Sequence, residues 1–192
     1  MKALLGGKGA NLAEMTNMGL PVPHGFTITT EACLAYLGKG SFPEGQMEEV
    51  EEHLVGLEAA MDKRLGDPSD PLLVSVRSGA KFSMPGMMDT VLNLGLNEET
   101  LQGLIALSGN ERFGWDAYRR FIAMFGRIVM DVAPRVEAGS DGKNVEYNRF
   151  DDALDEVKER VGATSDTDLD VQALKDVVVL YKAIVREQTG RE

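Results

Sequence analysis

The feature that most constrains this chain is a change in its apolar pattern near residue 96. Beyond that point, apolar residues recur at three- and four-residue spacing in four segments: 97–105, 113–132, 147–161 and 170–184. This spacing predicts about four amphipathic helices. Before residue 96, short apolar runs alternate with glycine and proline, which favours strands and turns. We therefore expect an α+β fold, with an α/β part over residues 1–96 and a helical subdomain over residues 97–192.

Three helices are expected in the first part. A short one is predicted over residues 10–18, with Gly19 supplying its end. Thr29 or Thr30 is expected to cap the second, because a hydroxyl at this position accepts a hydrogen bond from the first turn. Residues 44–65 carry an apolar stripe backed by acidic residues, which predicts a third, amphipathic helix.

Three strands are also expected in the first part. Residues 26–29 alternate between apolar and polar side chains, as in a half-buried strand. Residues 72–76 form a short, mostly apolar run that ends at Arg77, which predicts a buried strand. Residues 91–96 are the third candidate.

Charge and composition exclude several classes of function. The 192 residues contain 20 Lys and Arg against 31 Asp and Glu, a formal net charge of −11. A nucleic-acid surface or a polybasic membrane anchor is therefore not expected, and no apolar run approaches the ~18 residues of a membrane-spanning helix. The single cysteine, Cys33, lies between Ala32 and Leu34 and is expected to be a buried thiol. Because it cannot form a disulfide within the chain, a cytoplasmic location is expected.

Three glycines surround a lysine at the start of the chain. Gly6, Gly7 and Gly9 precede a predicted helix and flank Lys8. Glycine lets the backbone approach a ligand closely, and a helix start attracts anions, so this cluster suits a phosphate group. The spacing matches neither the phosphate-binding loop of nucleoside triphosphatases nor the dinucleotide-binding fingerprint. The alternative is a glycine-rich turn with a solvated lysine.

Arg77 is the second candidate for binding phosphate. A guanidinium at the C-terminal end of a strand has a fixed position and can bind phosphate oxygens with two hydrogen bonds. The alternative is an ion pair with one of the many acidic residues. Close to Arg77, residues 83–90 (SMPGMMDT) gather three methionines around Pro-Gly. This composition suits either an apolar lid over a ligand or packing against the helical part.

The two histidines are not expected to be catalytic. His24 lies in a turn between proline and glycine, and His53 lies among acidic residues on a predicted helix. Together with Cys33 they do not form a zinc-binding spacing. We expect structural or surface roles for both histidines, and no metal ligands in this chain.

Four segments in this order together resemble the nucleotide-binding domain of the pyruvate phosphate dikinase and phosphoenolpyruvate synthase family. They are residues 5–15 (LGGKGANLAEM), 19–26 (GLPVPHGF), 74–80 (VSVRSGA) and 83–95 (SMPGMMDTVLNLG). The last segment, like residues 113–132, is similar to the dikinase branch in particular. The resemblance covers residues 4–132, and the later helices match in general character.

This resemblance implies an incomplete ATP-grasp-type lobe in the first part of the chain. In the family, the matching lysine and arginine contact the ATP phosphates, which assigns this catalytic and nucleotide-binding role to Lys8 and Arg77. Further nucleotide contacts are expected from the surrounding motifs, at Gly7, Gly9, Ser83, Gly86, Met87, Asp89 and Thr90. The acidic ligands of Mg²⁺ are expected outside this chain. Catalysis at such a site rests mostly on positioning and charge neutralisation.

The family reaction converts ATP, phosphate and pyruvate to AMP, pyrophosphate and phosphoenolpyruvate through a phosphohistidine. The resemblance implies that a second ATP-grasp lobe, a phosphohistidine domain and a pyruvate-binding barrel follow residue 192 in a homodimeric enzyme. The chain is thus expected to be the N-terminal piece of a pyruvate phosphate dikinase, inactive by itself. The alternative is a free-standing nucleotide-binding or regulatory module without catalytic activity.

Overall fold

The computed structural model describes residues 1–79, 89–138 and 143–191. The chain divides into two compact units, each made of two stretches of sequence. Unit 1 comprises Met1–Leu65 and Arg77–Thr90, and unit 2 comprises Gly66–Val76 and Val91–Glu192.

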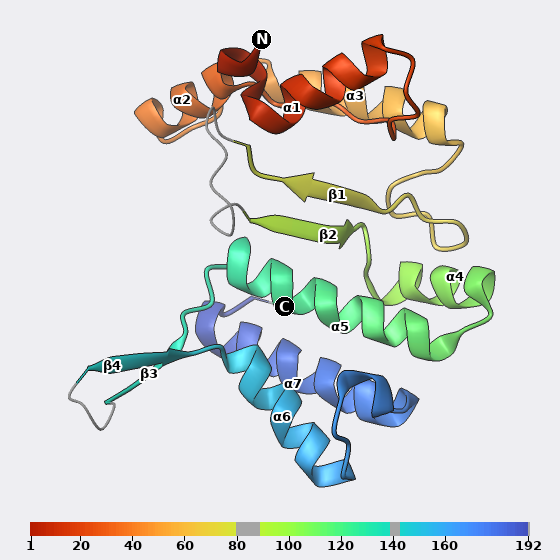
Figure 1. Cartoon of the computed structure of the whole chain (residues 1–192), viewed down its shortest axis with the longest axis vertical. Coiled ribbons are helices and arrows are strands. Elements are labelled where there is room, and N and C mark those ends of the chain that lie inside the picture. The colour runs from red at the N-terminus through yellow and green to blue at the C-terminus, as the bar shows by residue number, and fades with distance from the viewer. Residues whose placement is uncertain (80–88, 139–142, 192) are drawn as a thin grey trace. The chain divides into compact units, whose positions relative to one another are not determined.

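Within its described residues, unit 1 holds the three expected helices, α1 (Lys2–Asn17), α2 (Thr30–Lys39) and α3 (Gln46–Met61) (Figure 1). Helix α1 packs against α2. Thr30 Oγ1, at the start of α2, donates a hydrogen bond of 2.6 Å to the carbonyl oxygen of Ala3 in α1. The expected cap is confirmed at Thr29, whose hydroxyl accepts a hydrogen bond of 3.3 Å from the backbone N–H of Ala32.

Two expectations about these helices were wrong. Helix α1 starts at Lys2 instead of residue 10, because the residues on both sides of Gly6 are helical and meet there at a kink. Cys33 is exposed instead of buried. The whole helix shares this exposure: all α2 residues are described, and none of them is buried.

Residues 26–29 were expected to form a strand and do not. They belong to an irregular connection between α1 and α2, where Ile28 is 55% exposed. An alternating pattern specifies a strand only where a neighbouring strand pairs with it, and among the described residues no strand pairs with this segment. Phe26 instead stacks on His53 of α3, with ring centroids 5.7 Å apart. His53 therefore contributes to packing.

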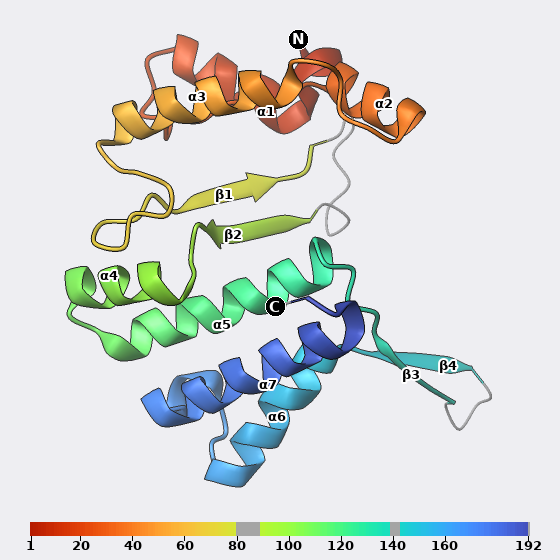
Figure 2. The same cartoon turned by 180° about the vertical axis from the view of Figure 1, so that it is seen from behind.

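The two other expected strands are present. Strands β1 (Val74–Arg77) and β2 (Thr90–Leu94) form a two-stranded sheet and run in opposite directions (Figure 2). The expected burial of β1 was wrong, because Val76 is 50% exposed, whereas Leu72, just before the strand, is buried. A sheet of two strands covers little of its own surface.

The helical pattern after residue 96 is confirmed in unit 2. Its described residues form four α-helices: α4 (Glu98–Ser108), α5 (Glu111–Ile128), α6 (Arg149–Val161) and α7 (Val171–Thr189). Helix α5 packs against α4 and α7, and α6 packs against α7. Leu101, Phe150, Leu174 and Tyr181 are among the fully buried side chains of the core that these helices enclose.

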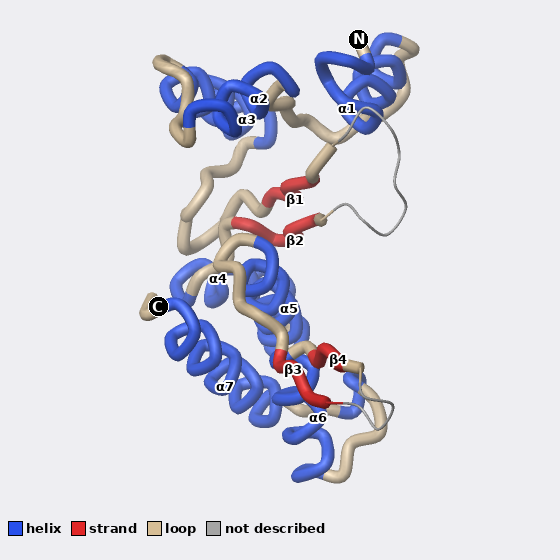
Figure 3. Tube along the Cα trace, turned by 90° about the vertical axis from the view of Figure 1, so that its left-hand side faces the viewer, coloured by secondary structure: helices blue, strands red, loops and turns tan. Residues whose placement is uncertain are grey.

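Between α5 and α6 lies a hairpin that was not expected. Strands β3 (Arg135–Ala138) and β4 (Asn144–Tyr147) are antiparallel neighbours (Figure 3). Tyr147, which was expected in a helix, pairs with Arg135, and the Arg135 guanidinium lies 4.9 Å from its ring centroid. The two strands read RVEA and NVEY, so polar and apolar residues alternate along each of them. Each alternation spans four residues, the shortest run that indicates a strand.

Each α-helix of unit 2 begins after a residue whose side chain accepts a hydrogen bond from the first turn. These caps are Asn97, Asn110, Asn148 and Asp170. Asn97 Oδ1 accepts hydrogen bonds of 2.9 Å from both Glu99 N and Thr100 N. Helix starts at Asn97 and Asp170 were expected and are confirmed, because a cap before an apolar stripe is a local signal.

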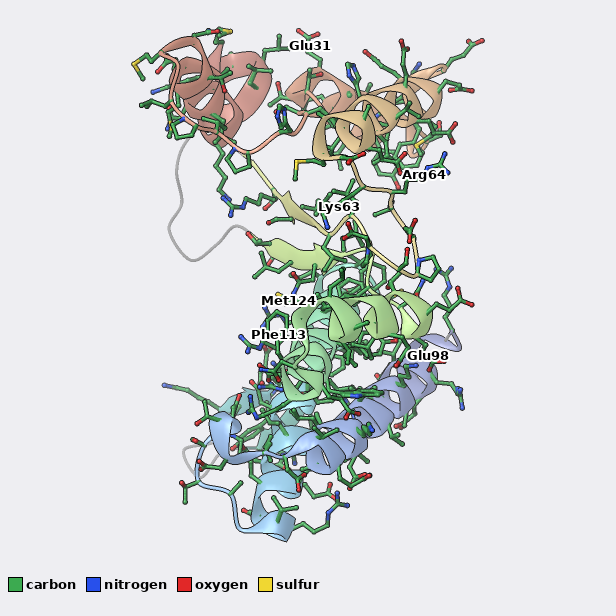
Figure 4. The ribbon with its side chains drawn as sticks, turned by 90° about the vertical axis from the view of Figure 1, so that its right-hand side faces the viewer. Glu31, Lys63, Arg64, Glu98, Phe113 and Met124 are labelled. Carbon is green, nitrogen blue, oxygen red and sulfur yellow. The ribbon has the colours of Figure 1, made fainter. Side chains whose placement is uncertain are left out.

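Two lysines of α7 form ion pairs with the first turns of α4 and α5. Lys182 donates a hydrogen bond to Glu98 (labelled in Figure 4) and lies 5.5 Å from the centroid of the Tyr118 ring. Lys175 Nζ lies 2.8 Å from Glu111 Oε1. Negative charge in a first turn also interacts favourably with the helix dipole. The hydrogen bond from Lys182 lowers the pKa of Glu98.

The short helix η1 (Asp166–Asp168), before α7, is held by cations from two other helices. Asp166 Oδ2 lies 2.8 Å from Arg119 Nη2, and Oδ1 lies 2.9 Å from Lys158 Nζ. Arg112 Nη2 donates a hydrogen bond of 2.7 Å to the carbonyl oxygen of the same residue. Burial alone would raise the pKa of Asp166, but the hydrogen bonds from Lys158 and Arg119 outweigh burial and keep that pKa below its ordinary value.

We expect unit 2 to lose stability in acid partly through Asp166. The pKa of this carboxyl is lower in the folded chain than the ordinary value of 3.8, so its contribution to stability is complete above that value and is lost as the pH falls through the folded pKa. Urea unfolding between about pH 6 and pH 2.5 should show a smaller acid-induced drop in midpoint for Asp166→Asn than for the parent.

The control for these unfolding measurements is Asp155→Asn, since Asp155 also pairs with Lys158 but is more exposed than Asp166. Its acid-induced drop should remain close to that of the parent. The same drop in the parent and in Asp166→Asn would contradict the assignment of the effect to Asp166.

Candidate functional site

The glycine-rich start of α1 contains an unusual backbone conformation. Gly6 has φ 67° and ψ 175°, a combination that essentially only glycine adopts. Its backbone divides α1 into two helical segments, so Gly7 and Lys8 lie in the first turn of the second segment. The first N–H groups of a helical segment have no acceptor within that segment and favour an anion. A substitution at Gly6 would strain the backbone that creates this helix start.

Gly9 has a packing role. A Cβ at this position would lie 3.1 Å from Thr27 Oγ1 and 3.2 Å from Leu5 Cβ, which is tighter than ordinary van der Waals contact. The missing side chain therefore lets Thr27 lie against α1. The nucleotide contacts expected of Gly7 and Gly9 remain predictions.

A hydrogen bond joins the two cationic motifs of the sequence. Lys8, which is half-buried, donates from Nζ to the carbonyl oxygen of Ser78 at 3.0 Å. Ser78 directly follows Arg77, the last residue of β1. All three residues belong to unit 1. The structure thus brings the Lys8 ammonium to the residue adjacent to Arg77, although 70 positions separate the bonded residues in the sequence.

Arg77 lies at the C-terminal end of β1, and its side chain is exposed. The strand fixes the backbone from which the guanidinium extends, as the sequence predicted. Solvent can therefore reach a charged group whose main-chain position is set by the sheet.

Ser78 also connects this site to the residue before β2. Its backbone N–H donates to the carbonyl oxygen of Asp89 at 3.1 Å, and its hydroxyl donates to the same oxygen at 2.9 Å. Asp89 is exposed, and Thr90, the first residue of β2, is half-buried. Two of the expected nucleotide contacts, Asp89 and Thr90, therefore lie beside Ser78, and their role remains a prediction.

Ser78 was not among the residues expected to contribute to the site. The residue lies within the motif that contains Arg77, so it could have been considered, but a carbonyl group has no side-chain signature that marks it as an acceptor. Three other predicted contacts, Ser83, Gly86 and Met87, lie outside the described residues, as does most of the methionine-rich segment.

The described residues carry neither a metal cluster nor a membrane span. Within residues 1–79, 89–138 and 143–191, no three His, Cys, Asp or Glu side chains lie where they could share a metal ion. No helix in these ranges combines the length and apolar character needed to cross a bilayer. The candidate site consists of Lys8, Arg77 and the helix start after Gly6.

Comparison with known proteins relates this site to one family. A family profile described as "Pyruvate phosphate dikinase, AMP/ATP-binding domain" matches residues 2–44, which contain the glycine cluster and Lys8. The chain is 51% identical over 193 residues to pyruvate, phosphate dikinase 1, chloroplastic, of Arabidopsis thaliana, an alignment that covers 100% of this chain. It is 46% identical over 190 residues to pyruvate, phosphate dikinase of Giardia intestinalis, covering 99% of this chain.

These alignments confirm the resemblance expected from the motifs and extend it to the whole chain. The alignments include Arg77. They also include the helices after residue 132, for which the motifs gave a match in general character alone. The chain spans 19% of the length of the Arabidopsis thaliana protein and 20% of that of the Giardia intestinalis protein.

Proposed function

We propose that this chain, which is similar over its full length to the N-terminal region of pyruvate phosphate dikinases, binds the phosphates of ATP through Lys8 and Arg77. In this proposal, residues 1–96 contribute an ATP-grasp-type lobe, and residues 97–192 form a helical subdomain. The bound ATP would be used for phosphoryl transfer to a phosphohistidine and from there to pyruvate.

The observation that carries this proposal is the hydrogen bond from Lys8 Nζ to the Ser78 carbonyl oxygen at 3.0 Å. The Lys8 ammonium contacts the residue next to Arg77, so a bound polyanion could be attracted by both cations. A lysine ammonium has three N–H donors, so an anion can be bound while Ser78 is still contacted. The guanidinium of Arg77 adds donors that match two phosphate oxygens at once.

In the proposed site, the chain would position the ATP phosphates and offset their negative charge. The Lys8 ammonium and the Arg77 guanidinium would offset negative charge on the transferred phosphoryl group and on the leaving phosphates. Backbone N–H groups at the helix start after Gly6 would add partial positive charge. The described residues contain no group of three His, Cys, Asp or Glu side chains that could share a metal ion. In this proposal the ligands of Mg²⁺ would come from outside this chain.

The wider reaction would need parts of a longer protein. The relatives are about five times as long as this chain, and we propose a second ATP-grasp lobe, a phosphohistidine domain and a pyruvate-binding barrel as its partners in a homodimeric enzyme. A cytoplasmic location also belongs to the proposal, although the Arabidopsis thaliana relative is named as a chloroplastic protein.

Calorimetric titration with MgATP tests the phosphate roles. We expect Lys8→Ala and Arg77→Ala each to weaken binding by about 1.5–3 kcal/mol, roughly 10- to 150-fold, because each removes a charge-assisted hydrogen bond. The matched controls are Lys39→Ala and Arg64→Ala, which remove exposed cations of the same unit; Arg64 is labelled in Figure 4. The controls should retain the affinity of the parent.

Two outcomes would contradict the proposal. One is a parent chain that binds MgATP while both site variants bind it equally well. The other is a folded parent chain with no measurable affinity for any adenine nucleotide, which would remove the premise that residues 1–192 contribute to binding.

A further inference from the structure

We propose that Ser78 is a positioning residue for the phosphate site. Its side-chain hydroxyl keeps Lys8 in place by fixing Ser78, whose carbonyl oxygen Lys8 contacts. This inference rests on the proposed function for its consequence in ATP binding. Its structural part, the dependence of Lys8 on the Ser78 hydroxyl, can be tested without any nucleotide.

Three groups of Ser78 have partners within unit 1. The backbone N–H donates to the Asp89 carbonyl oxygen at 3.1 Å, and Oγ donates to the same oxygen at 2.9 Å. The Ser78 carbonyl oxygen accepts the hydrogen bond of 3.0 Å from Lys8 Nζ. Ser78 therefore connects three parts of the chain: the start of α1, the end of β1 and the start of β2.

The hydroxyl matters because Ser78 lies at an exposed end of a short sheet. It follows the last residue of β1, and its side chain is exposed. Hydrogen bonds at such ends open readily in water. The hydroxyl is a second donor to the Asp89 carbonyl oxygen, so it holds Ser78 against Asp89 when the backbone hydrogen bond alone would open. The Ser78 carbonyl oxygen then stays directed toward Lys8.

Fixing Lys8 in advance favours anion binding. A lysine side chain has several rotatable bonds, and ordering it during binding reduces affinity. A lysine already held by Ser78 loses less of this freedom when a phosphate arrives. Ser78 directly follows Arg77, so the contacts of Ser78 support the backbone placement of both cations. The Ser78 hydroxyl would thus raise affinity without touching the nucleotide.

Acylation of lysine in the chain without nucleotide tests the structural part. The rate at Lys8 is measured by mass spectrometry after brief treatment with a succinimidyl ester, with the exposed Lys39 as the internal reference. Loss of one hydrogen bond in Ser78→Ala should raise the rate at Lys8 roughly two- to tenfold. Ser78→Thr retains a hydroxyl and suits a strand end, so it should return the rate toward that of the parent.

The matched control is Thr16→Val. It also removes a hydrogen bond from an exposed hydroxyl to a backbone carbonyl in unit 1, here from Thr16 Oγ1 to the Leu12 oxygen at 2.9 Å. It should leave the Lys8 rate unchanged. A Lys8 rate in Ser78→Ala equal to that of the parent would overturn the proposal, as would an equal rise in Thr16→Val. Circular dichroism checks that each variant retains its helices.

Titration with MgATP and with adenosine tests the consequence for binding. Ser78→Ala should weaken ATP binding roughly two- to tenfold and leave adenosine binding unchanged, because only the phosphate contacts depend on Lys8. Adding Ser78→Ala to Lys8→Ala should have little further effect, since the two residues act through one contact.

The outcomes separate the two proposals. If Lys8→Ala weakens ATP binding and Ser78→Ala does not, the positioning role is wrong and the proposed function stands. If Lys8→Ala has no effect on ATP binding, the proposed function fails and the binding consequence of Ser78 fails with it. The acylation rates still decide whether Ser78 fixes Lys8.

Discussion

Replacing Arg119 by methionine should lower the free energy of unfolding of unit 2 by about 3 kcal/mol, because it leaves a buried carboxylate with too few partners. Arg119 and Asp116, both on α5, are each only 5% exposed. Arg119 Nε donates to Asp116 Oδ1 at 2.9 Å, and Nη2 lies 2.8 Å from Asp166 Oδ2. Methionine has a similar length but cannot replace either contact.

The neighbours of this pair set the size of the effect. Asp116 retains a hydrogen bond from Arg120, and Asp166 retains Lys158, so we expect the lower end of the range for breaking a buried ion pair. Burial raises the pKa of Tyr181 to about 12, and the adjacent Arg119 acts in the opposite direction. The variant therefore also removes a favourable neighbour of the Tyr181 hydroxyl.

Urea unfolding measures this effect. The single tryptophan of the chain, Trp115, lies in α5 and reports on unit 2 by fluorescence. Arg160→Met is the control: Arg160 pairs with Asp176 at 2.5 Å, but its side chain is 51% exposed. Exposed pairs contribute about 0–1 kcal/mol. Equal losses in the two variants would contradict a special role for the buried pair.

Replacing Gly103 by alanine is the second substitution with a large expected effect. Gly103 is a buried residue of α4. A Cβ there would lie 2.2 Å from the carbonyl oxygen of Pro68 and 2.9 Å from that of Ser69. These are backbone atoms, so no side-chain rotation can relieve the clash. Overpacking of this kind costs about 3 kcal/mol or more, which outweighs the gain of about 1 kcal/mol that alanine brings to a helix.

Trp115 fluorescence during urea unfolding also measures this loss. Gln102→Ala, at the adjacent exposed position of α4, is the control and should change the free energy of unfolding by no more than about 0.5 kcal/mol. A Gly103→Ala variant as stable as the parent would mean that the segment at Pro68 can move away from α4 at little cost.

The parts of the fold that sequence could predict depend on local signals. Asn97 and Asp170 were identifiable as helix starts because a capping side chain acts on the next few residues. The apolar stripe of α5 was identifiable because a buried helix face repeats every three to four residues. Both signals lie within one element and need no knowledge of its neighbours.

The parts that could not be predicted depend on neighbours. The pattern of residues 26–29 suits a strand, but only a pairing strand would make it one. Cys33 has apolar flanks, yet it is exposed, and none of the residues of its helix, all of them described, is buried. The buried charges of Asp116 and Arg119 were also missed, because charged residues on a helix are usually exposed.

The candidate site has one part that the sequence predicts and another that depends on contacts between distant segments. Lys8 and Arg77 could be selected as candidates from sequence because their surroundings suit phosphate and both lie in motifs that resemble the family. The contact between their motifs could not, because it joins a side chain to a backbone carbonyl across 70 positions. The hydroxyl of Ser78 was missed because it too contacts a backbone carbonyl, that of Asp89.

Protection of Lys8 by nucleotide tests the central claim most directly. Acylation rates at Lys8 and Lys39 are measured with no ligand, with MgATP and with adenosine. If Lys8 binds the phosphates, saturating MgATP should slow acylation at Lys8 severalfold, adenosine should not, and Lys39 should react at the same rate throughout. An unchanged rate at Lys8 in a chain that demonstrably binds MgATP would show that the nucleotide does not contact this lysine.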